Sequence, residues 1–242
     1  MTRKSTLAVT LKRLAGAAAV GAALCATSVA QAGVLDFEAP VDAPFVFNGD
    51  VLQMGKYYVE GAGDPGFVGS IGNNESCFNV QCPANNSSTY YSALNDGYMF
   101  FGMLDGSSFS LSSLDASFIG AGEASYPGVA GLLYITAFNA SGIVDEIYLR
   151  LLGPIGGSFN FATYDLSGFG NGELFTDVRI ASYACNTAGD CDRSTNQANF
   201  ALDNIITIDA SEVPEPATFA LMGLGLLGLR AMSRPSARRR AA

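Results

Sequence analysis

The sequence predicts an all-β protein: a single antiparallel β-sandwich, jelly-roll-like, over residues 33–212, with an N-terminal signal peptide and a C-terminal single transmembrane helix. Two observations predict the sandwich. Short apolar or alternating runs recur between turn signals, and no part of the body keeps a 3.6-residue period. About ten strands at this spacing are typical of sandwiches and jelly rolls.

The candidate strands are spread along the whole body. Turn-rich segments at 139–142 and 168–172 suit antiparallel hairpins. Residues 61–96 hold few strand signals, so we expect one long loop there. The strands are expected at 34–38, 45–48, 51–60, 98–102, 108–111, 116–119, 131–139, 143–152, 159–166, 174–183 and 199–209.

The first 32 residues have the features of a secretory signal peptide. A basic opening precedes an apolar run over 14–27, and Ala30-Gln31-Ala32 supplies a small-x-small cleavage pattern before Gly33. The run is too short for a permanent membrane anchor. We therefore expect the Sec-type export machinery to translocate the chain and signal peptidase to remove residues 1–32.

The last 30 residues, 213–242, combine three features in a fixed order. Pro214-Glu215-Pro216 comes first, and an uncharged, glycine-rich apolar stretch over 217–229 follows it. The stretch is expected to form a short membrane helix, and terminal arginines should stay in the cytoplasm. The acidic body would then lie outside the inner membrane. The arginines that form this membrane stop are Arg230, Arg234, Arg238, Arg239 and Arg240.

This order of features resembles the PEP-CTERM sorting signal of Gram-negative bacteria. The resemblance covers residues 213–240, and Arg230 departs from the pattern because it ends the apolar helix early. It implies recognition by an exosortase, a membrane-embedded transpeptidase-like enzyme that processes the chain near Pro214-Glu215-Pro216. It also implies transient residence in the inner membrane, then delivery to the cell surface or extracellular matrix of exopolysaccharide-producing bacteria.

The body between the two signals is strongly acidic. Between residues 33 and 212 only Lys56, Arg150, Arg179 and Arg193 are basic, against 21 acidic residues, which gives a formal charge of 4 − 21 = −17. Nucleic-acid binding is excluded because the phosphate backbone would be repelled. The chain has no His, which excludes Ser-His-Asp and Cys-His catalysis and His-ligated zinc.

Four cysteines remain once the signal peptide is removed: Cys77, Cys82, Cys185 and Cys191. An even number of cysteines in an exported chain predicts two disulfides. Local pairing, Cys77 with Cys82 and Cys185 with Cys191, is the simplest of the three connectivities. A four-thiolate zinc site is the alternative, but neither pair has the usual two-residue spacing.

The two ends of the body carry a candidate metal site. Asp36-Phe37-Glu38 lies on the first expected strand and Leu202-Asp203-Asn204 on the last. These two short motifs resemble those of the first and last strands of carbohydrate-binding-type jelly rolls, in which these two strands are neighbours. The resemblance implies a structural calcium ion held by Glu38 and Asp203, with Asp36 as a weaker third ligand. The alternative is that Asp203-Asn204 only ends hydrogen bonding beside a turn.

Two other patterns are weaker. Residues 61–66 match the dinucleotide-binding expression G-x-G-x-x-G, but Pro65 and the absence of a βαβ unit leave only a loop. Asp190, Asp192, Ser194 and Asn196 alternate like calcium ligands, but the glycine and glutamate of an EF-hand are missing. A solvated hairpin tip is the simpler interpretation.

Three functions compete. The leading hypothesis is a non-enzymatic surface or matrix protein, sorted by exosortase, whose acidic surface is solubilising or binds divalent cations. The alternative is a carbohydrate-binding module that recognises exopolysaccharide. Its candidate sugar-stacking residues are Tyr57, Tyr58, Tyr90, Tyr91, Tyr98 and Tyr126, although the chain lacks Trp.

The third hypothesis is a glycan hydrolase that uses paired carboxylates. Asp145 and Glu146 are adjacent on an expected strand, so they point to opposite faces and cannot flank one glycosidic bond. We therefore expect no enzymatic activity and assign no catalytic residue.

Overall fold

The computed structural model describes residues 32–41, 44–74, 79–122, 125–193 and 196–209. The predicted sorting signal over 213–242 and all but the last residue of the predicted signal peptide lie outside these ranges. Within them, no helix is long and apolar enough to cross a membrane. Because residues 217–229 lie outside these ranges, the membrane helix expected there stays a prediction.

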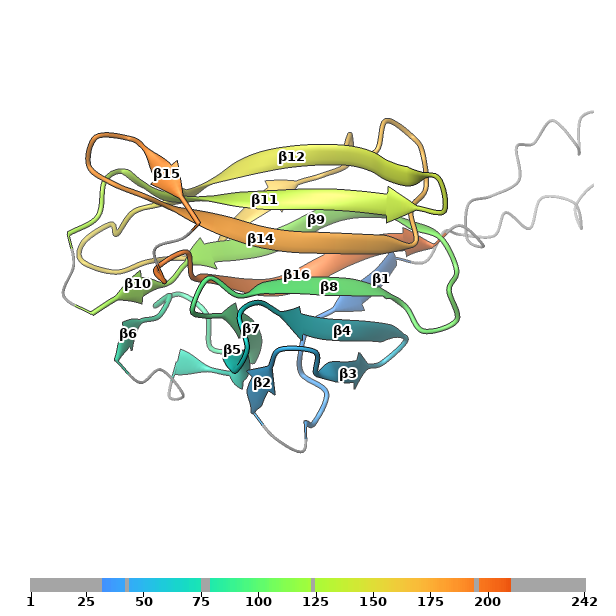
Figure 1. Cartoon of the computed structure of the whole chain (residues 1–242), viewed down its shortest axis with the longest axis horizontal. Coiled ribbons are helices and arrows are strands. Elements are labelled where there is room, and N and C mark those ends of the chain that lie inside the picture. Colours follow the sequence, from blue (N-terminus) through green and yellow to red (C-terminus); the bar gives the residue numbers. More distant parts are fainter. Residues whose placement is uncertain (1–31, 42–43, 75–78, 123–124, 194–195, 210–242) are drawn as a thin grey trace, which may run out of the picture. The chain divides into compact units, whose positions relative to one another are not determined.

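The described chain folds into two antiparallel sheets and one small extra pair of strands (Figure 1). The first sheet has the order β13 (Ala162–Asp165), β9 (Phe109–Phe118), β16 (Phe200–Asp209), β7 (Tyr90–Ala93), β5 (Phe67–Gly72) and β2 (Phe45–Phe47), and β1 (Ala32–Leu35) also pairs with β16. The second has the order β12 (Gly142–Leu152), β11 (Val129–Asn139), β14 (Asp177–Cys185), β8 (Tyr98–Met103), β4 (Tyr57–Ala62) and β3 (Val51–Met54), and β15 (Cys191–Asp192) pairs with β14. The extra pair is β6 (Val80–Gln81) with β10 (Gly120–Ala121).

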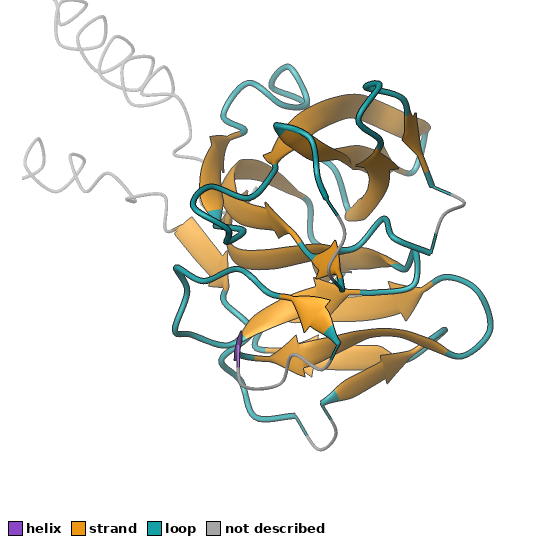
Figure 2. Cartoon of the chain, turned by 90° about the vertical axis from the view of Figure 1, so that its left-hand side faces the viewer, coloured by secondary structure: helices purple, strands orange, loops and turns teal. Residues whose placement is uncertain are grey.

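Alternating side chains build one apolar core between the sheets. Leu133, Ile135 and Ala137 of β11 are fully buried, as are Phe101 of β8 and Phe109 of β9, whose rings lie 5.7 Å apart. Each of the leucine, isoleucine and phenylalanine side chains contributes about 1.5–3 kcal/mol when it leaves water. Figure 2 shows that strands make up most of the described chain. The predicted all-β, two-sheet antiparallel sandwich is confirmed.

The prediction of one long loop over 61–96 is wrong. Strands β5 and β7 lie in this segment and form part of the first sheet. All four residues of β7 are buried, because Tyr90 packs with Ile119 and with Ala201 of β16 in a second apolar cluster, which Val80, Leu94 and Phe161 cover. A strand that is buried on both faces does not alternate in hydrophobicity, so its signal in the sequence is weak.

Two other strand boundaries differ from the prediction. The segment 51–60 is a hairpin, β3 and β4, because the chain turns at Gly55, whose φ of 60° suits glycine. The expected strands at 108–111 and 116–119 are one continuous strand, β9. The expected pairing of the first and last strands is confirmed, since Leu35 of β1 lies opposite Ile205 of β16.

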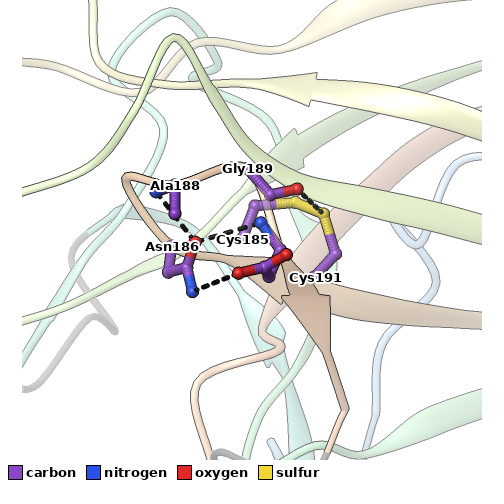
Figure 3. The surroundings of a disulfide bond; sticks show 6 residues. Cys185, Asn186, Ala188, Gly189 and Cys191 are labelled. Atoms are coloured by element: carbon purple, nitrogen blue, oxygen red, sulfur yellow. Dashed lines mark hydrogen bonds between the residues drawn. A yellow bond between two sulfur atoms is a disulfide. The ribbon is translucent and has the colours of Figure 1, made fainter.

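One predicted disulfide is confirmed. Cys185 at the end of β14 is bonded to Cys191 in β15, with their Cα atoms 4.0 Å apart (Figure 3). The Oδ1 atom of Asn186 accepts hydrogen bonds from the backbone N–H groups of Ala188 and Asp190, which orders the intervening turn. Cys82 is also disulfide-bonded. Its predicted partner Cys77 lies outside the described residues, so that pairing stays a prediction.

Replacing Cys185 and Cys191 together by Ser should lower the free energy of unfolding by about 2 kcal/mol, because the closed loop restricts the unfolded chain. For a domain of this size the melting temperature should fall by about 4–8 °C. Calorimetry of a fragment spanning residues 33–212 measures this, with a Cys77→Ser/Cys82→Ser variant as the comparison. An unchanged melting temperature would show that the bond adds nothing to stability.

Candidate binding face

Side chains of the second sheet that alternate with the core residues form a continuous polar and aromatic surface, here called the outer face. The strand register places them together: Arg179 of β14 lies opposite both Phe100 of β8 and Thr136 of β11. Tyr134 of β11 lies opposite Tyr148 of β12. The outer face consists of Tyr58, Glu60, Tyr98, Phe100, Tyr134, Thr136, Phe138, Glu146, Tyr148, Arg150, Asp177, Arg179 and Tyr183, and Arg193 lies at its end.

Aromatic rings run across this face. The rings of Tyr134 and Tyr148 are stacked, with centroids 4.6 Å apart and planes 17° from parallel. Tyr183 lies 6.4 Å from the first and 6.1 Å from the second. Tyr98 and Phe100 pack edge to face at 5.7 Å on the neighbouring strand β8. Such ring pairs stabilise one another beyond the apolar area that they bury.

Two arginines lie on these rings. The guanidinium carbon of Arg179 is 5.5 Å from the ring centre of Tyr134 and 6.0 Å from that of Phe138. The guanidinium carbon of Arg193 is 5.4 Å from the ring of Tyr98 and 5.9 Å from that of Tyr183. These distances suit cation–π attraction.

Tyrosine hydroxyls donate hydrogen bonds to two carboxylates of the outer face, Asp177 and Glu146. The Tyr58 hydroxyl donates to Asp177 and the Tyr134 hydroxyl donates to Glu146. Burial, followed by the hydrogen bond to Asp177, raises the pKa of Tyr58 well above its ordinary value. Asp177 also accepts a 2.6 Å hydrogen bond from the Thr176 hydroxyl. These carboxylates are therefore held by uncharged donors.

A glycine makes the hydrogen bond between Tyr58 and Asp177 possible. Gly102 of β8 lies opposite Tyr58 on one side and Asp177 on the other, so the tyrosine ring must cross over it. A Cβ atom at Gly102 would stand 2.7 Å from the Tyr58 ring and 2.5 Å from the carbonyl oxygen of Thr176. No other residue type would leave room for the ring to reach the carboxylate.

Two open hollows mark the surface. One, of about 430 Å³, is lined by Tyr58, Glu60, Phe100, Phe138 and Asp177. The other, of about 340 Å³, is lined by Gly63, Asp64, Asn95, Asp96, Tyr98 and Arg193. The Asp96 carboxylate accepts hydrogen bonds from the backbone N–H groups of Asn196 and Ala198, which ties two loops together beside this hollow. Aromatic walls with a few polar groups are typical of ligand sites.

The structure separates the tyrosines that the sequence suggested as sugar-stacking residues. Tyr58 and Tyr98 lie on the outer face, but Tyr57, Tyr90 and Tyr91 are buried. Tyr126 packs against Phe118 and Phe159. Sequence reasoning missed Tyr134, Tyr148, Tyr183, Arg179 and Arg193. The aromatic and polar residues at every second position of 134–138 could have pointed to the side of β11 that faces away from the core.

Two of the proposed calcium ligands, Glu38 and Asp203, contact the same short segment, residues 86–89. Glu38 accepts a 2.8 Å hydrogen bond from the backbone N–H of Thr89. Asp203 is buried and accepts from the side chains of Asn86 at 2.7 Å and Ser88 at 2.8 Å. Burial raises the pKa of Asp203. Asp36 instead accepts from the backbone N–H of Glu38 at 3.2 Å.

These residues fit a calcium ion only in part. Carboxylate, amide and hydroxyl oxygens are ligands that calcium prefers, but Asp203 already accepts three hydrogen bonds from uncharged donors, Asn86, Ser88 and the backbone of Asn204. In the described part of the chain, no three Asp, Glu, Cys or His side chains are grouped to hold a metal ion. Calcium binding by Glu38 and Asp203 stays a prediction.

The adjacent acids Asp145 and Glu146 point to opposite faces, as predicted. Asp145 accepts a hydrogen bond from the backbone N–H of Gly170, whereas Glu146 is held by Tyr134 on the outer face. In the weaker calcium pattern, Asp190 contacts Asn186 and position 194 lies outside the described residues.

Comparison with known families settles the C-terminal segment. Residues 212–240 are a PEP-CTERM protein-sorting motif. This confirms the resemblance read from Pro214-Glu215-Pro216, the apolar stretch and the arginines. The PEP-CTERM motif implies an exported protein that is processed by an exosortase and displayed at the cell surface. A search of curated proteins finds no relative of this chain.

Solved structures resemble the body at low identity. A DUF4465 family protein from Bacteroides caccae is 16% identical, with a TM-score of 0.49, covering 74% of this chain and 99% of its own. The CBM22-1 xylan-binding domain of Paenibacillus barcinonensis Xyn10C is 9% identical, with a TM-score of 0.34, covering 76% and 97%. A Stig cyclase from Fischerella is 9% identical, with a TM-score of 0.36, covering 74% and 98%.

The calcium hypothesis predicts that EDTA lowers the melting temperature of the 33–212 fragment and that added calcium restores it. An ion at a hundredfold excess over Kd adds about 2.7 kcal/mol to the native state, or roughly 5–10 °C for a domain of this size. Asp203→Ala should abolish the response to calcium. Identical melting curves in EDTA and in millimolar calcium would leave Asp203 as a residue that only ties the segment 86–89 to β16.

Proposed function

We propose that this chain is a non-enzymatic, polysaccharide-binding protein of the cell surface or extracellular matrix, and that the outer face of its jelly-roll-like sandwich is the binding surface. In this proposal the Sec-type machinery exports the chain, the inner membrane holds it transiently, and an exosortase releases it. The observation that carries the proposal is the group of tyrosine rings and arginines on the outer face, in which the Tyr148 ring is 54% exposed and lies over the buried ring of Tyr134.

The Tyr148 ring is a rigid platform for a sugar. It is 54% exposed, and its position is fixed by stacking on Tyr134, whose hydroxyl is in turn held by Glu146. Ordering a side chain on binding costs about 0.5–1.5 kcal/mol. A ring that is already held in place avoids most of this cost, so its apolar face is free to pack against the C–H face of a sugar ring.

The carboxylates of the outer face suit the binding of a polysaccharide better than its hydrolysis. Glycoside hydrolysis needs two carboxyl groups on either side of one bond, with one group available as an acid. On this face, Asp177 and Glu146 are each held by a tyrosine hydroxyl on separate strands. Such groups can hydrogen-bond sugar hydroxyls without taking part in proton transfer.

A purely structural role is the second candidate. The formal charge of −17 over residues 33–212 supports a body that keeps a matrix protein soluble or binds divalent cations among polysaccharide chains. This role needs no particular face of the domain. Variants of the outer face therefore separate it from specific binding.

Tyr148→Ala should weaken binding to the exopolysaccharide of the producing strain about tenfold, because the exposed ring is lost while the fold remains. Affinity electrophoresis and titration calorimetry of the 33–212 fragment measure this. The matched control is Phe45→Ala, which removes a 54% exposed ring from the first sheet. If the polysaccharide binds neither variant nor the parent protein, the structural role is favoured.

Sorting gives an independent prediction. In cells without exosortase, the protein should accumulate in the inner-membrane fraction with residues 212–240 still attached. In cells with the enzyme it should be found shortened at the surface or in the medium. Fractionation followed by mass spectrometry of the C-terminus distinguishes the two. Equal distribution in both strains would contradict processing by exosortase.

A further inference from the structure

In the part of the chain that the structure describes, no carboxylate forms an ion pair with an arginine of the outer face. Of the four basic residues between 33 and 212, three lie on or beside this face: Arg150, Arg179 and Arg193. Within the described residues the single ion pair is that of the fourth, Lys56, with Asp209. In a domain with 21 acidic residues, three unpaired guanidinium groups on one side need an explanation.

The nearest carboxylate on the same strand is held elsewhere. Asp177 lies two residues before Arg179 on the same side of β14, yet it accepts hydrogen bonds from Tyr58 and Thr176. The contact with Tyr58 depends on Gly102, which leaves space for the ring to cross β8. Tyr58 and Tyr134 thus satisfy two carboxylates of the face, Asp177 and Glu146, and the arginines lie on the aromatic rings instead.

Arg179 carries an unsatisfied donor. Its Nε–H is enclosed and has no hydrogen-bond partner, and Nη2 donates to the Thr136 hydroxyl at 3.3 Å. A buried donor without a partner destabilises the folded state. Packing against Tyr134 and Phe138 holds the guanidinium there. The protein thus keeps a cation on this face that its own groups do not satisfy.

Resting on the proposed function, we propose that the outer face recognises an acidic polysaccharide, with the carboxylates of its uronate-type sugars bound by Arg179 and Arg193. A guanidinium is planar and donates two parallel hydrogen bonds to a carboxylate. Tyr134, beside Arg179, is buried, but the Tyr148 ring stacked on it is 54% exposed, and Tyr183, beside Arg193, is half-buried. The ring centroids of Tyr148 and Tyr183 are 6.1 Å apart, so sugar rings can pack on these two tyrosines while their carboxylates reach the nearby guanidinium groups.

The acidic body does not prevent this. Charges on the solvent-exposed surface are screened beyond about 8 Å at physiological ionic strength, whereas a carboxylate in contact with a guanidinium is well within that distance. Asp64 and Asp96 line the hollow beside Arg193, where Asp96 accepts backbone hydrogen bonds, and Glu60 lines the larger hollow. These acids would repel the ligand, so removal of the Glu60 charge should strengthen binding.

The test uses one polymer in two forms: polygalacturonate, and the same polymer after chemical reduction of its carboxylates to alcohols. The parent 33–212 fragment should bind the acidic form at least tenfold more tightly than the reduced form. Arg179→Gln and Arg193→Gln should each lose about tenfold toward the acidic form and be unchanged toward the reduced form. Arg179→Lys should be intermediate, because it keeps the charge without the planar fork.

Two controls make the result specific. Lys56→Gln removes the same charge away from the face and should bind like the parent, and Glu60→Gln should bind the acidic form more tightly. Melting temperatures verify that each variant is folded. If both forms bind equally and the arginine variants behave like the parent, this inference is wrong and the proposed function stands. If neither form nor the strain's own exopolysaccharide binds, the proposed function itself fails.

Discussion

Strand register in the second sheet is the constraint on which the rest of the structure depends. Side chains alternate across a strand, so burying Leu133, Ile135 and Phe101 in the core forces their neighbours onto the opposite face. A shift of one residue would exchange the two sets and place tyrosines and arginines in the core. The free energy of burying the apolar set therefore also fixes the composition and order of the exposed set.

Side chains of the outer face also hold one another in place. Tyrosine hydroxyls hold Asp177 and Glu146, and tyrosine rings lie beneath Arg179 and Arg193. The hydroxyls of Tyr58 and Tyr134 thus orient neighbouring carboxylates, and the ring of Tyr148 stays 54% exposed. A surface of this kind is ordered before a ligand arrives, and this lowers the entropic cost of binding.

A disulfide and two hydrogen bonds hold the edge of the outer face where Arg193 lies. The Cys185–Cys191 bond holds β15 against β14, and Arg193 comes two residues after the second cysteine. The Asp96 carboxylate binds the backbone of Asn196 and Ala198 and so connects the following loop to the β7–β8 turn. Without these ties the loop that carries Arg193 would lack the packing that a strand receives from its neighbours.

The sequence alone determined the features that depend on neighbouring residues, the sorting motif and the all-β class, and it favoured local cysteine pairing, of which the structure shows the Cys185–Cys191 bond. It did not reveal β7, because a strand buried on both faces loses the alternation that marks a strand, nor β5, which contains two glycines. Nor could it separate the buried Tyr57 from the exposed Tyr58, or bring Tyr58, Arg179 and Tyr148 onto one surface. Only tertiary structure decided these points, because the residues lie on different strands and meet through long-range pairing that no local pattern encodes.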